Sequence, residues 1–257
     1  MKKLTSLLFC IAMLFSLTAC GSKVSDDALD AFEAVIQNMA KMKSADYVLT
    51  MDATNKEGDQ KMTLEGSYNL QNAKPLLSAS LSMEMDNEKQ EDAIQFYIDG
   101  DYMYLNLMEF MKQKQSLAGM LPTEELPSLD TAADTFKLPK DELKKYLKEA
   151  SLKGDTLTMV FDCEKIMDVS KESGSSTSQL SANTTINKLN LVMELKDNAM
   201  KKTTISMDIT QTVAGEKEAT SADIDIEFKN INKATPIQFP DFTDYIETES
   251  SLLAGFM

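Results

Sequence analysis

Long stretches in which apolar and polar residues alternate limit the fold of this chain more than any other feature. Within residues 45–85 and again within 187–231, apolar side chains occur at every second position. This period places the apolar side chains of a strand on one face. Polar turns separate the stretches, as in Asn55-Lys56-Glu57-Gly58-Asp59. The pattern therefore predicts antiparallel meanders with one apolar face.

A further hairpin is predicted from residues 93–98 and 102–107, joined by Asp99-Gly100-Asp101. The two carboxylates of this turn raise calcium binding as an alternative. A calcium loop of the EF type also needs carboxylates at later fixed offsets and a final glutamate, and these are missing. We expect a plain turn and no metal site.

Helical periods occur in three places. Apolar residues spaced by three and four positions predict a helix that starts after Ser25, a favoured capping residue, and runs to about residue 42. Similar spacing predicts helices from Leu107 to Met120 and from Pro139 to Ala150, with an acidic, proline-bearing loop between them. These two helices define an expected helical insertion at about 107–150. A short strand (155–161) and a helix capped by Asp162 should follow.

The N-terminus has the pattern of an export signal. Lys2 and Lys3 precede an apolar run from Leu4 to Leu17, which is shorter than the roughly 20 residues of a membrane-spanning helix. The run ends in Leu17-Thr18-Ala19-Cys20, which resembles the bacterial lipobox, in which the cysteine receives diacylglycerol. The predicted organisation is a removed signal peptide (1–19), a lipidated tether (20–25), one domain (26–247) and a C-terminal tail (248–257).

Charge and cysteine usage agree with a location outside the cytoplasmic membrane, attached through Cys20. Without Lys2 and Lys3 the chain keeps 24 lysines against 41 acidic residues, a net charge of about −17. This negative net charge excludes a nucleic-acid partner. It also repels the protein from anionic lipid, so the lipid on Cys20 must hold the protein at the membrane. Cys163 remains as the one cysteine without lipid in the mature chain, so no intrachain disulfide can form.

The residue types needed for most enzyme chemistry are missing. The chain has no histidine, arginine or tryptophan, and it lacks a phosphate-binding glycine loop. Cys163 as a nucleophile would have no histidine base, so a structural thiol is favoured. The acidic row Asp223, Asp225 and Glu227 is favoured as a solvated strand face over a metal site. We expect neither an enzyme nor a cofactor.

Methionine is unusually frequent, with 16 of the 18 residues remaining after removal of residues 1–19. Many lie on the predicted apolar strand faces, where a flexible thioether either fills gaps in a core or adapts to varied apolar ligands. The first alternative is favoured, and the second yields the candidate ligand-binding residues. These are Met51, Leu64, Leu81, Met83, Met85, Met193 and Met207.

The order of these features resembles the lipoprotein-carrier fold, which includes the periplasmic lipoprotein chaperone and mycobacterial lipid-transporting lipoproteins. Three phrases resemble uncharacterised surface lipoproteins of Gram-positive bacteria: Met39-Ala40-Lys41-Met42-Lys43-Ser44-Ala45, Gly100-Asp101-Tyr102-Met103-Tyr104 and Phe239-Pro240-Asp241-Phe242. The resemblance covers most of the mature chain. It implies an α+β fold with a large curved antiparallel sheet, a half-barrel of about 9 to 11 strands that wraps the N-terminal helix and the helical insertion.

This fold implies a membrane-anchored extracytoplasmic lipoprotein, on the outer face of the cell membrane, that binds a lipid or other apolar ligand between sheet and helices. The alternative is a structural or protein-interaction lipoprotein without a small-molecule ligand, whose partner is an envelope protein. No signature residue of the carriers can be matched in the sequence, so the ligand role follows from the fold.

Overall fold

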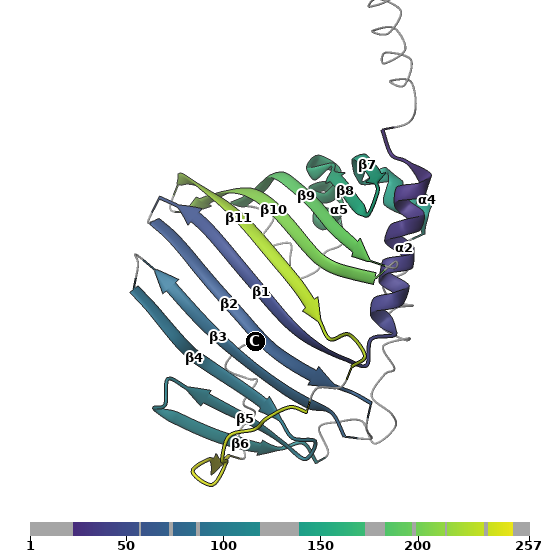
Figure 1. Ribbon diagram of the computed structural model, residues 1–257. Helices are drawn as coiled ribbons and strands as arrows, with labels where there is room; N and C mark the ends of the chain where they lie inside the picture. Colours follow the sequence, from purple (N-terminus) through teal and green to yellow (C-terminus); the bar gives the residue numbers. More distant parts are fainter. Residues whose placement is uncertain are drawn as a thin grey trace, which may run out of the picture.

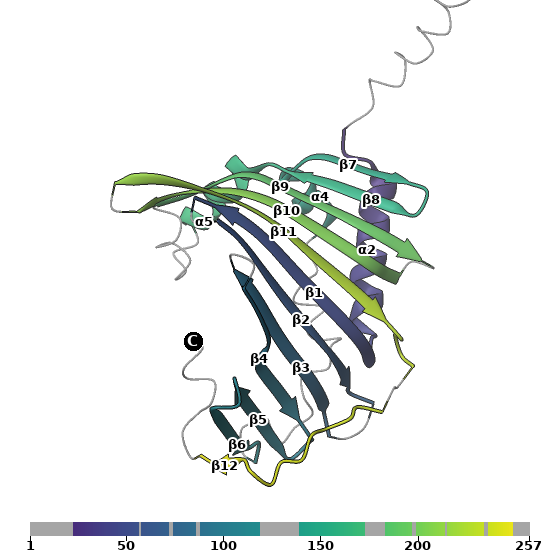
Figure 2. The ribbon, with the colours of Figure 1, turned by 60° about the vertical axis from the view of Figure 1, so that its left-hand side comes forward.

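A computed structural model describes residues 23–56, 58–71, 74–85, 88–118, 139–172, 183–196, 199–213, 215–233 and 236–248. These residues form one open, curved sheet of twelve strands accompanied by three helices (Figures 1 and 2). The predicted α+β class and the large curved sheet are confirmed. The sheet exceeds the predicted 9 to 11 strands because two short strands, β6 and β12, come from segments without a strong strand pattern.

The elements follow the chain in two groups. The first comprises α2 (Asp26–Ala40), β1 (Ser44–Asn55), β2 (Gly58–Asn69), β3 (Leu76–Met85), β4 (Glu88–Ile98), β5 (Tyr102–Leu107) and β6 (Met111–Ser116). The second comprises α4 (Lys140–Lys145), β7 (Leu147–Lys153), β8 (Thr156–Phe161), α5 (Cys163–Glu172), β9 (Thr184–Lys196), β10 (Ala199–Val213), β11 (Glu216–Lys229) and β12 (Ile246–Glu247).

Two antiparallel meanders lie side by side in the sheet, in the order β12-β6-β5-β4-β3-β2-β1-β11-β10-β9-β8-β7. Strands β1 to β6 form one meander and β7 to β11 form the other. The first strand of one pairs with the last strand of the other, in the register Asp46↔Lys229 to Thr54↔Ser221. This pairing of distant segments joins the two meanders into a single curved surface (Figure 2).

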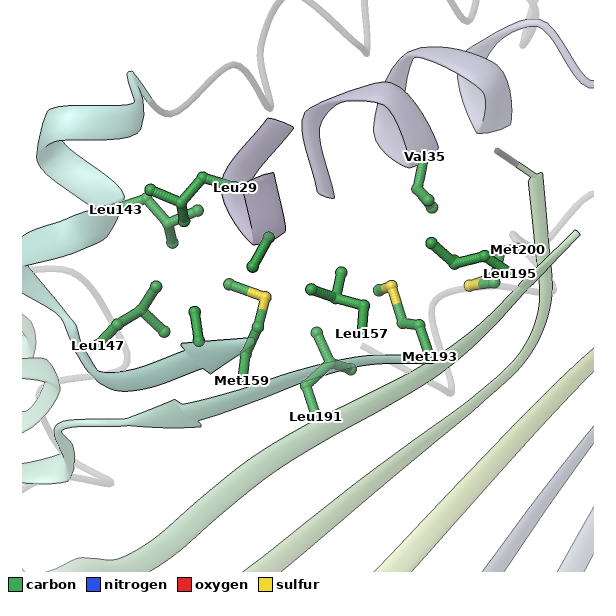
Figure 3. Packing of buried hydrophobic residues seen from close by; sticks show 12 residues of the cluster. Leu29, Val35, Leu143, Leu147, Leu157, Met159, Leu191, Met193, Leu195 and Met200 are labelled. Carbon is green, nitrogen blue, oxygen red and sulfur yellow. The ribbon is translucent and has the colours of Figure 1, made fainter. Parts of the chain in front are cut away.

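Helix α2 packs on the apolar face of the second meander. As predicted, Ser25 caps it, because the Ser25 hydroxyl accepts a hydrogen bond from the Ala28 amide. Figure 3 shows Leu29 and Val35 of α2, with Leu143 of α4, directed toward residues of β7 to β10. The fully buried members of this main core include Leu29, Val35, Leu157 and Met159.

The predicted helix from Leu107 to Met120 is wrong where the structure describes it. Strand β5 ends at Leu107, a tight turn follows, and Met111–Ser116 runs back as β6. Met108 and Glu109 adopt positive φ angles of 50° and 61°, which reverse the chain. Asn106 fixes the turn, since its side chain accepts from the Glu109 amide and donates to the Glu109 carboxylate. Up to residue 116, the first described part of the expected helical insertion is therefore a β-hairpin.

The helix predicted from Pro139 to Ala150 is also too long. Helix α4 ends at Lys145, and Leu147 begins β7. A register shift between Leu147 and Glu149 lets both Leu147 and Ala150 reach the main core. Because the bulge puts these two residues three positions apart on one face, it imitates a helical spacing in the sequence.

The C-terminal segment crosses the opposite face of the sheet and ends at its edge. Phe239, Phe242 and Tyr245 pack against Tyr97 and Tyr104, with the Phe242 and Tyr104 rings stacked at 3.6 Å between centroids. Strand β12 then pairs in parallel with β6. The segment therefore covers part of one face and also extends one edge of the sheet.

A Gly66→Ala substitution is expected to destabilise the domain by about 1–3 kcal/mol, because it overpacks a close strand contact. A Cβ at Gly66 would lie 2.1 Å from the Ser78 carbonyl oxygen and 2.8 Å from the Tyr47 hydroxyl. Urea unfolding followed by circular dichroism measures the effect. Glu65→Ala, at an exposed position of the same strand, is the control and should change stability by less than about 0.5 kcal/mol. A stabilised Gly66→Ala protein would contradict the contact.

Candidate ligand-binding face

Directly paired residues in neighbouring strands share a face of the sheet, so the strand register defines rows of side chains that cross it. One row runs through Leu191, Ile205, Ile224, Met51, Met62 and Met83. The next row runs through Met193, Thr203, Ile226, Leu49, Leu64, Leu81, Ile94 and Leu107. Together they form a nearly continuous apolar face.

Packing covers this face at both ends. At one end α2 and α4 cover β7 to β10 and form the main core. At the other, Met103, Leu105 and Leu117 form a smaller core with residues of β4 and β5. No described helix makes an extended contact with β1, β2, β3 or β11. The middle of the apolar face belongs to neither core.

We call this middle part the open apolar face. Its eight residues are all partly buried, and they come from β1, β2, β3 and β11. They are Leu49, Met51, Met62, Leu64, Leu81, Met83, Ile224 and Ile226. Methionine supplies three of the eight side chains, which makes the surface deformable.

The structure brings four of the seven predicted ligand-binding residues into the open apolar face: Met51, Leu64, Leu81 and Met83. Met207 lies on the same side of the sheet, one row further, opposite Ala222. Met85 ends β3 and is 57% exposed. Met193 is buried in the main core below α2 (Figure 3), where it contributes to packing.

Sequence reasoning left Leu49, Met62, Ile224 and Ile226 out of the candidate site. Their period-two pattern marks them as apolar-face residues, as it does for the four found. The sequence does not show that β1 pairs with β11. This pairing places Ile224 beside Met51 and Ile226 beside Leu49.

The Asp99 turn is built as an ordinary turn. The Asp99 carboxylate accepts hydrogen bonds from the amides of Asp101 and Tyr102, at 3.0 and 2.9 Å, and from the Tyr104 hydroxyl at 2.7 Å. Burial by itself would raise the pKa of Asp99, but these hydrogen bonds outweigh it and the pKa is lowered. Burial and the hydrogen bond to Asp99 raise the pKa of Tyr104. The carboxylate is thus used to hold the turn.

The other chemical candidates also have structural partners. Asp225 lies on the face opposite the apolar rows, where a hydrogen bond from Thr204 and the ammonium of Lys202 lower its pKa. Burial raises the pKa of the Cys163 thiol, which disfavours the reactive thiolate. No group of three potential metal ligands occurs within the described part of the chain.

A cavity of about 620 Å³ lies at the turn between β1 and β2. Polar and charged residues line it, among them Asp52, Asp59, Lys61 and Glu84. None of the seven predicted ligand-binding residues lines it. Lys61 lies 3.3 Å from Asp52, and Thr54 donates to Asp59 at 2.7 Å, so these groups satisfy one another.

The predicted lipidation residue, Cys20, lies outside the described residues. Among the helices that the structure describes, none has the length and apolar character needed to span a bilayer.

The sequence matches a family model over residues 27–243, which includes every strand of the open apolar face. The chain belongs to this family of unknown function, DUF6612. No curated protein matches it in sequence. The open apolar face is thus a feature of a DUF6612 member, and it lies wholly within the matched region.

Several solved structures are similar to this DUF6612 chain. LprF from Mycobacterium bovis is 12% identical, with 86% of this chain and 99% of that chain covered and a TM-score of 0.44. The lipoprotein LppX from Mycobacterium tuberculosis is 9% identical, with 83% and 100% covered and a TM-score of 0.37. A putative outer membrane lipoprotein-sorting protein domain from Vibrio parahaemolyticus is 12% identical, with 82% and 95% covered and a TM-score of 0.23. A mycobacterial lipoprotein and a lipoprotein-sorting domain, kinds of protein that the sequence resembles, are thus among the structural matches.

Proposed function

We propose that this protein is a membrane-anchored extracytoplasmic lipoprotein that binds a lipid or another apolar molecule on the open apolar face. The observation that carries the proposal is that no described helix covers the middle of a continuous apolar face. Eight aliphatic or thioether side chains lie between two packed cores and belong to neither. Contiguous apolar surface of this kind is a binding feature in soluble domains.

The dimensions of the face fit one hydrocarbon chain. From β11 to β3 there are three strand spacings of about 4.8 Å, or roughly 14 Å. One leaflet of bilayer hydrocarbon is about 15 Å thick, which is the depth that a lipid acyl chain occupies. The methionines allow the face to adapt to chains of different shape. A single acyl chain lying across these strands would contact the apolar side chains of all four strands.

The lipobox at Cys20 supports anchoring at the outer surface of the cell membrane. The acidic body, with a net charge of about −17 after removal of residues 1–19, has no electrostatic reason to stay at an anionic membrane. Two acyl chains give stable attachment where one gives reversible binding. We therefore assign the membrane attachment to lipid on Cys20 and the ligand to the sheet.

Met62→Lys tests the ligand assignment. Met62 is central, paired with Met51 on β1 and Met83 on β3, so an ammonium there removes the apolar character of the middle of the face. We expect affinity for a fluorescent fatty acid to fall at least about tenfold, which corresponds to roughly 1.4 kcal/mol. Fluorescence titration of the purified soluble domain measures the affinity, and native mass spectrometry of the same protein detects lipid carried through purification.

Thr63→Lys is the matched control. Thr63 is the next residue on β2 and pairs with Thr50 and Ser82 on the opposite face. The Thr63→Lys substitution adds the same charge to the same strand as Met62→Lys, and it should leave fatty-acid affinity unchanged. Equal loss in both variants, or no binding by the wild-type domain, would contradict the proposal.

A second function is favoured by a specific observation at the turn between β5 and β6. Phe110 is 92% exposed there, and Met108 and Met111 on either side of it are also exposed. Phenylalanine and methionine are enriched at protein interfaces relative to the rest of the surface. The alternative is a structural or protein-interaction lipoprotein. An envelope protein retained at equal stoichiometry by the wild type and lost with Phe110→Ser, together with no bound lipid, would favour it.

A further inference from the structure

The segment before α2 is part of the sheet edge. The Ala150 amide of β7 donates to the Lys23 carbonyl at 2.9 Å, and the Ser25 amide donates to the Ala150 carbonyl at 3.0 Å. Val24 and Ala150 form a parallel bridge. The Lys23 ammonium reaches the Glu149 carboxylate at 2.9 Å. The sequence predicted a lipidated tether at residues 20–25, and Lys23 within it is held by β7.

This attachment shortens the connection to the predicted lipid. Gly21 and Ser22 are the two residues between Cys20 and Lys23. Three successive Cα–Cα steps span at most about 11 Å. If Cys20 carries the lipid, Lys23 and the part of β7 around Ala150 that holds it must lie within about that distance of the bilayer surface.

The charge distribution around β7 favours the same orientation. Residues 23–33 and 139–153, which surround the attachment, contain six lysines and seven acidic residues, so this edge is nearly neutral. Ion pairs join them, including Lys144 with Asp26 and Lys140 with Asp30 and Glu33. The mature chain as a whole carries about −17. An anionic membrane therefore repels the remainder of the body more strongly than this edge.

We infer that the β7 edge, with the first turns of α2 and α4, faces the anionic bilayer in which Cys20 is anchored, and that the sheet extends away from it. In Figures 1 and 2 the start of α2 lies beside β7, at the opposite end of the sheet from β6. The inference rests on the proposed anchoring at Cys20. The partner of this surface is the membrane itself.

The orientation bears on how the proposed ligand is held. Four strand spacings separate β7 from β11, so the open apolar face begins roughly 19 Å from the membrane-facing edge along the sheet. A molecule bound there would have left the bilayer completely. On this account the protein holds an extracted molecule and does not shield a lipid that stays half inserted.

Resonance energy transfer from a dye on the protein to a labelled lipid in vesicles tests the orientation. The full lipidated chain, with Cys163→Ser to remove the native thiol, receives a donor dye at either Lys153→Cys on β7 or Lys89→Cys on β4. Both positions are exposed. The vesicles contain phosphatidylglycerol and a headgroup-labelled acceptor lipid. Because eight strand spacings, roughly 38 Å along the sheet, separate the two strands, transfer from position 153 should exceed transfer from position 89 at least about twofold.

Two further samples make the result specific. Ten glycine and serine residues inserted between Ser22 and Lys23 should remove most of the difference while the protein stays on the vesicles. Zwitterionic vesicles should reduce the difference, because the repulsion disappears. Equal transfer from both positions, more transfer from position 89, or a difference unaffected by the insertion would overturn the orientation. A wild-type chain that does not bind vesicles overturns it together with the Cys20 anchor. Fatty-acid binding by the soluble domain is measured separately and fails or succeeds by itself.

Discussion

Replacing Cys20 by serine is expected to move the protein from the membrane fraction to the medium, or to leave it as an unprocessed precursor. Lipid attached to this residue is the proposed membrane contact, and each buried acyl CH₂ contributes about 0.8 kcal/mol to membrane binding. Serine has no thiol to receive diacylglycerol. Fractionation and metabolic labelling with a fatty-acid analogue measure the outcome, and labelling should be abolished.

Cys10→Ser is the matched control for this prediction. Cys10 is the other cysteine of the N-terminal segment and lies within the apolar run that should be removed. Its substitution should leave labelling and fractionation unchanged. A Cys20→Ser protein that still incorporates the labelled lipid would show that the lipobox assignment is wrong.

Replacing Leu157 by alanine should destabilise the folded domain by about 2–5 kcal/mol, the cost of deleting a fully buried leucine side chain and leaving a cavity. Leu157 is 0% exposed and lies in the main core beneath α2. Domains of ordinary stability unfold with about 5–15 kcal/mol, so much of the total would be lost. Urea unfolding of the soluble domain, monitored by circular dichroism, gives the change in free energy.

Leu152→Ala provides the comparison within the same hairpin. Leu152 pairs directly with Leu157 across β7 and β8 but remains 36% exposed. Because about a third of its surface stays in water and truncation leaves no closed cavity, the loss should be smaller than for Leu157→Ala, below about 2 kcal/mol. Equal losses at both positions would mean that the main core does not determine the stability of this region.

Local patterns were sufficient wherever one face of an element is buried and its period is regular. The cap at Ser25, the alternation in β1 to β3 and β9 to β11, and the Asp99 turn were all predicted from neighbouring residues. Local patterns gave wrong predictions at the turn after Leu107 and at the bulge near Lys148. In both places a local backbone irregularity changes the direction of the side chains, and the residue types alone do not reveal it.

By itself the sequence determined the strand faces, the acidic charge and the missing catalytic residue types, and it shows a lipobox-like pattern that ends at Cys20, because each depends on composition or on spacing within one segment. Only the tertiary structure decided that β1 pairs with β11, which joins two meanders and brings Met51 beside Ile224. It also decided where α2 lies, and therefore that Met193 is packed while Met62 is left on the open apolar face. Contacts between residues far apart in the chain depend on the burial of whole elements against each other, and no single segment encodes that choice.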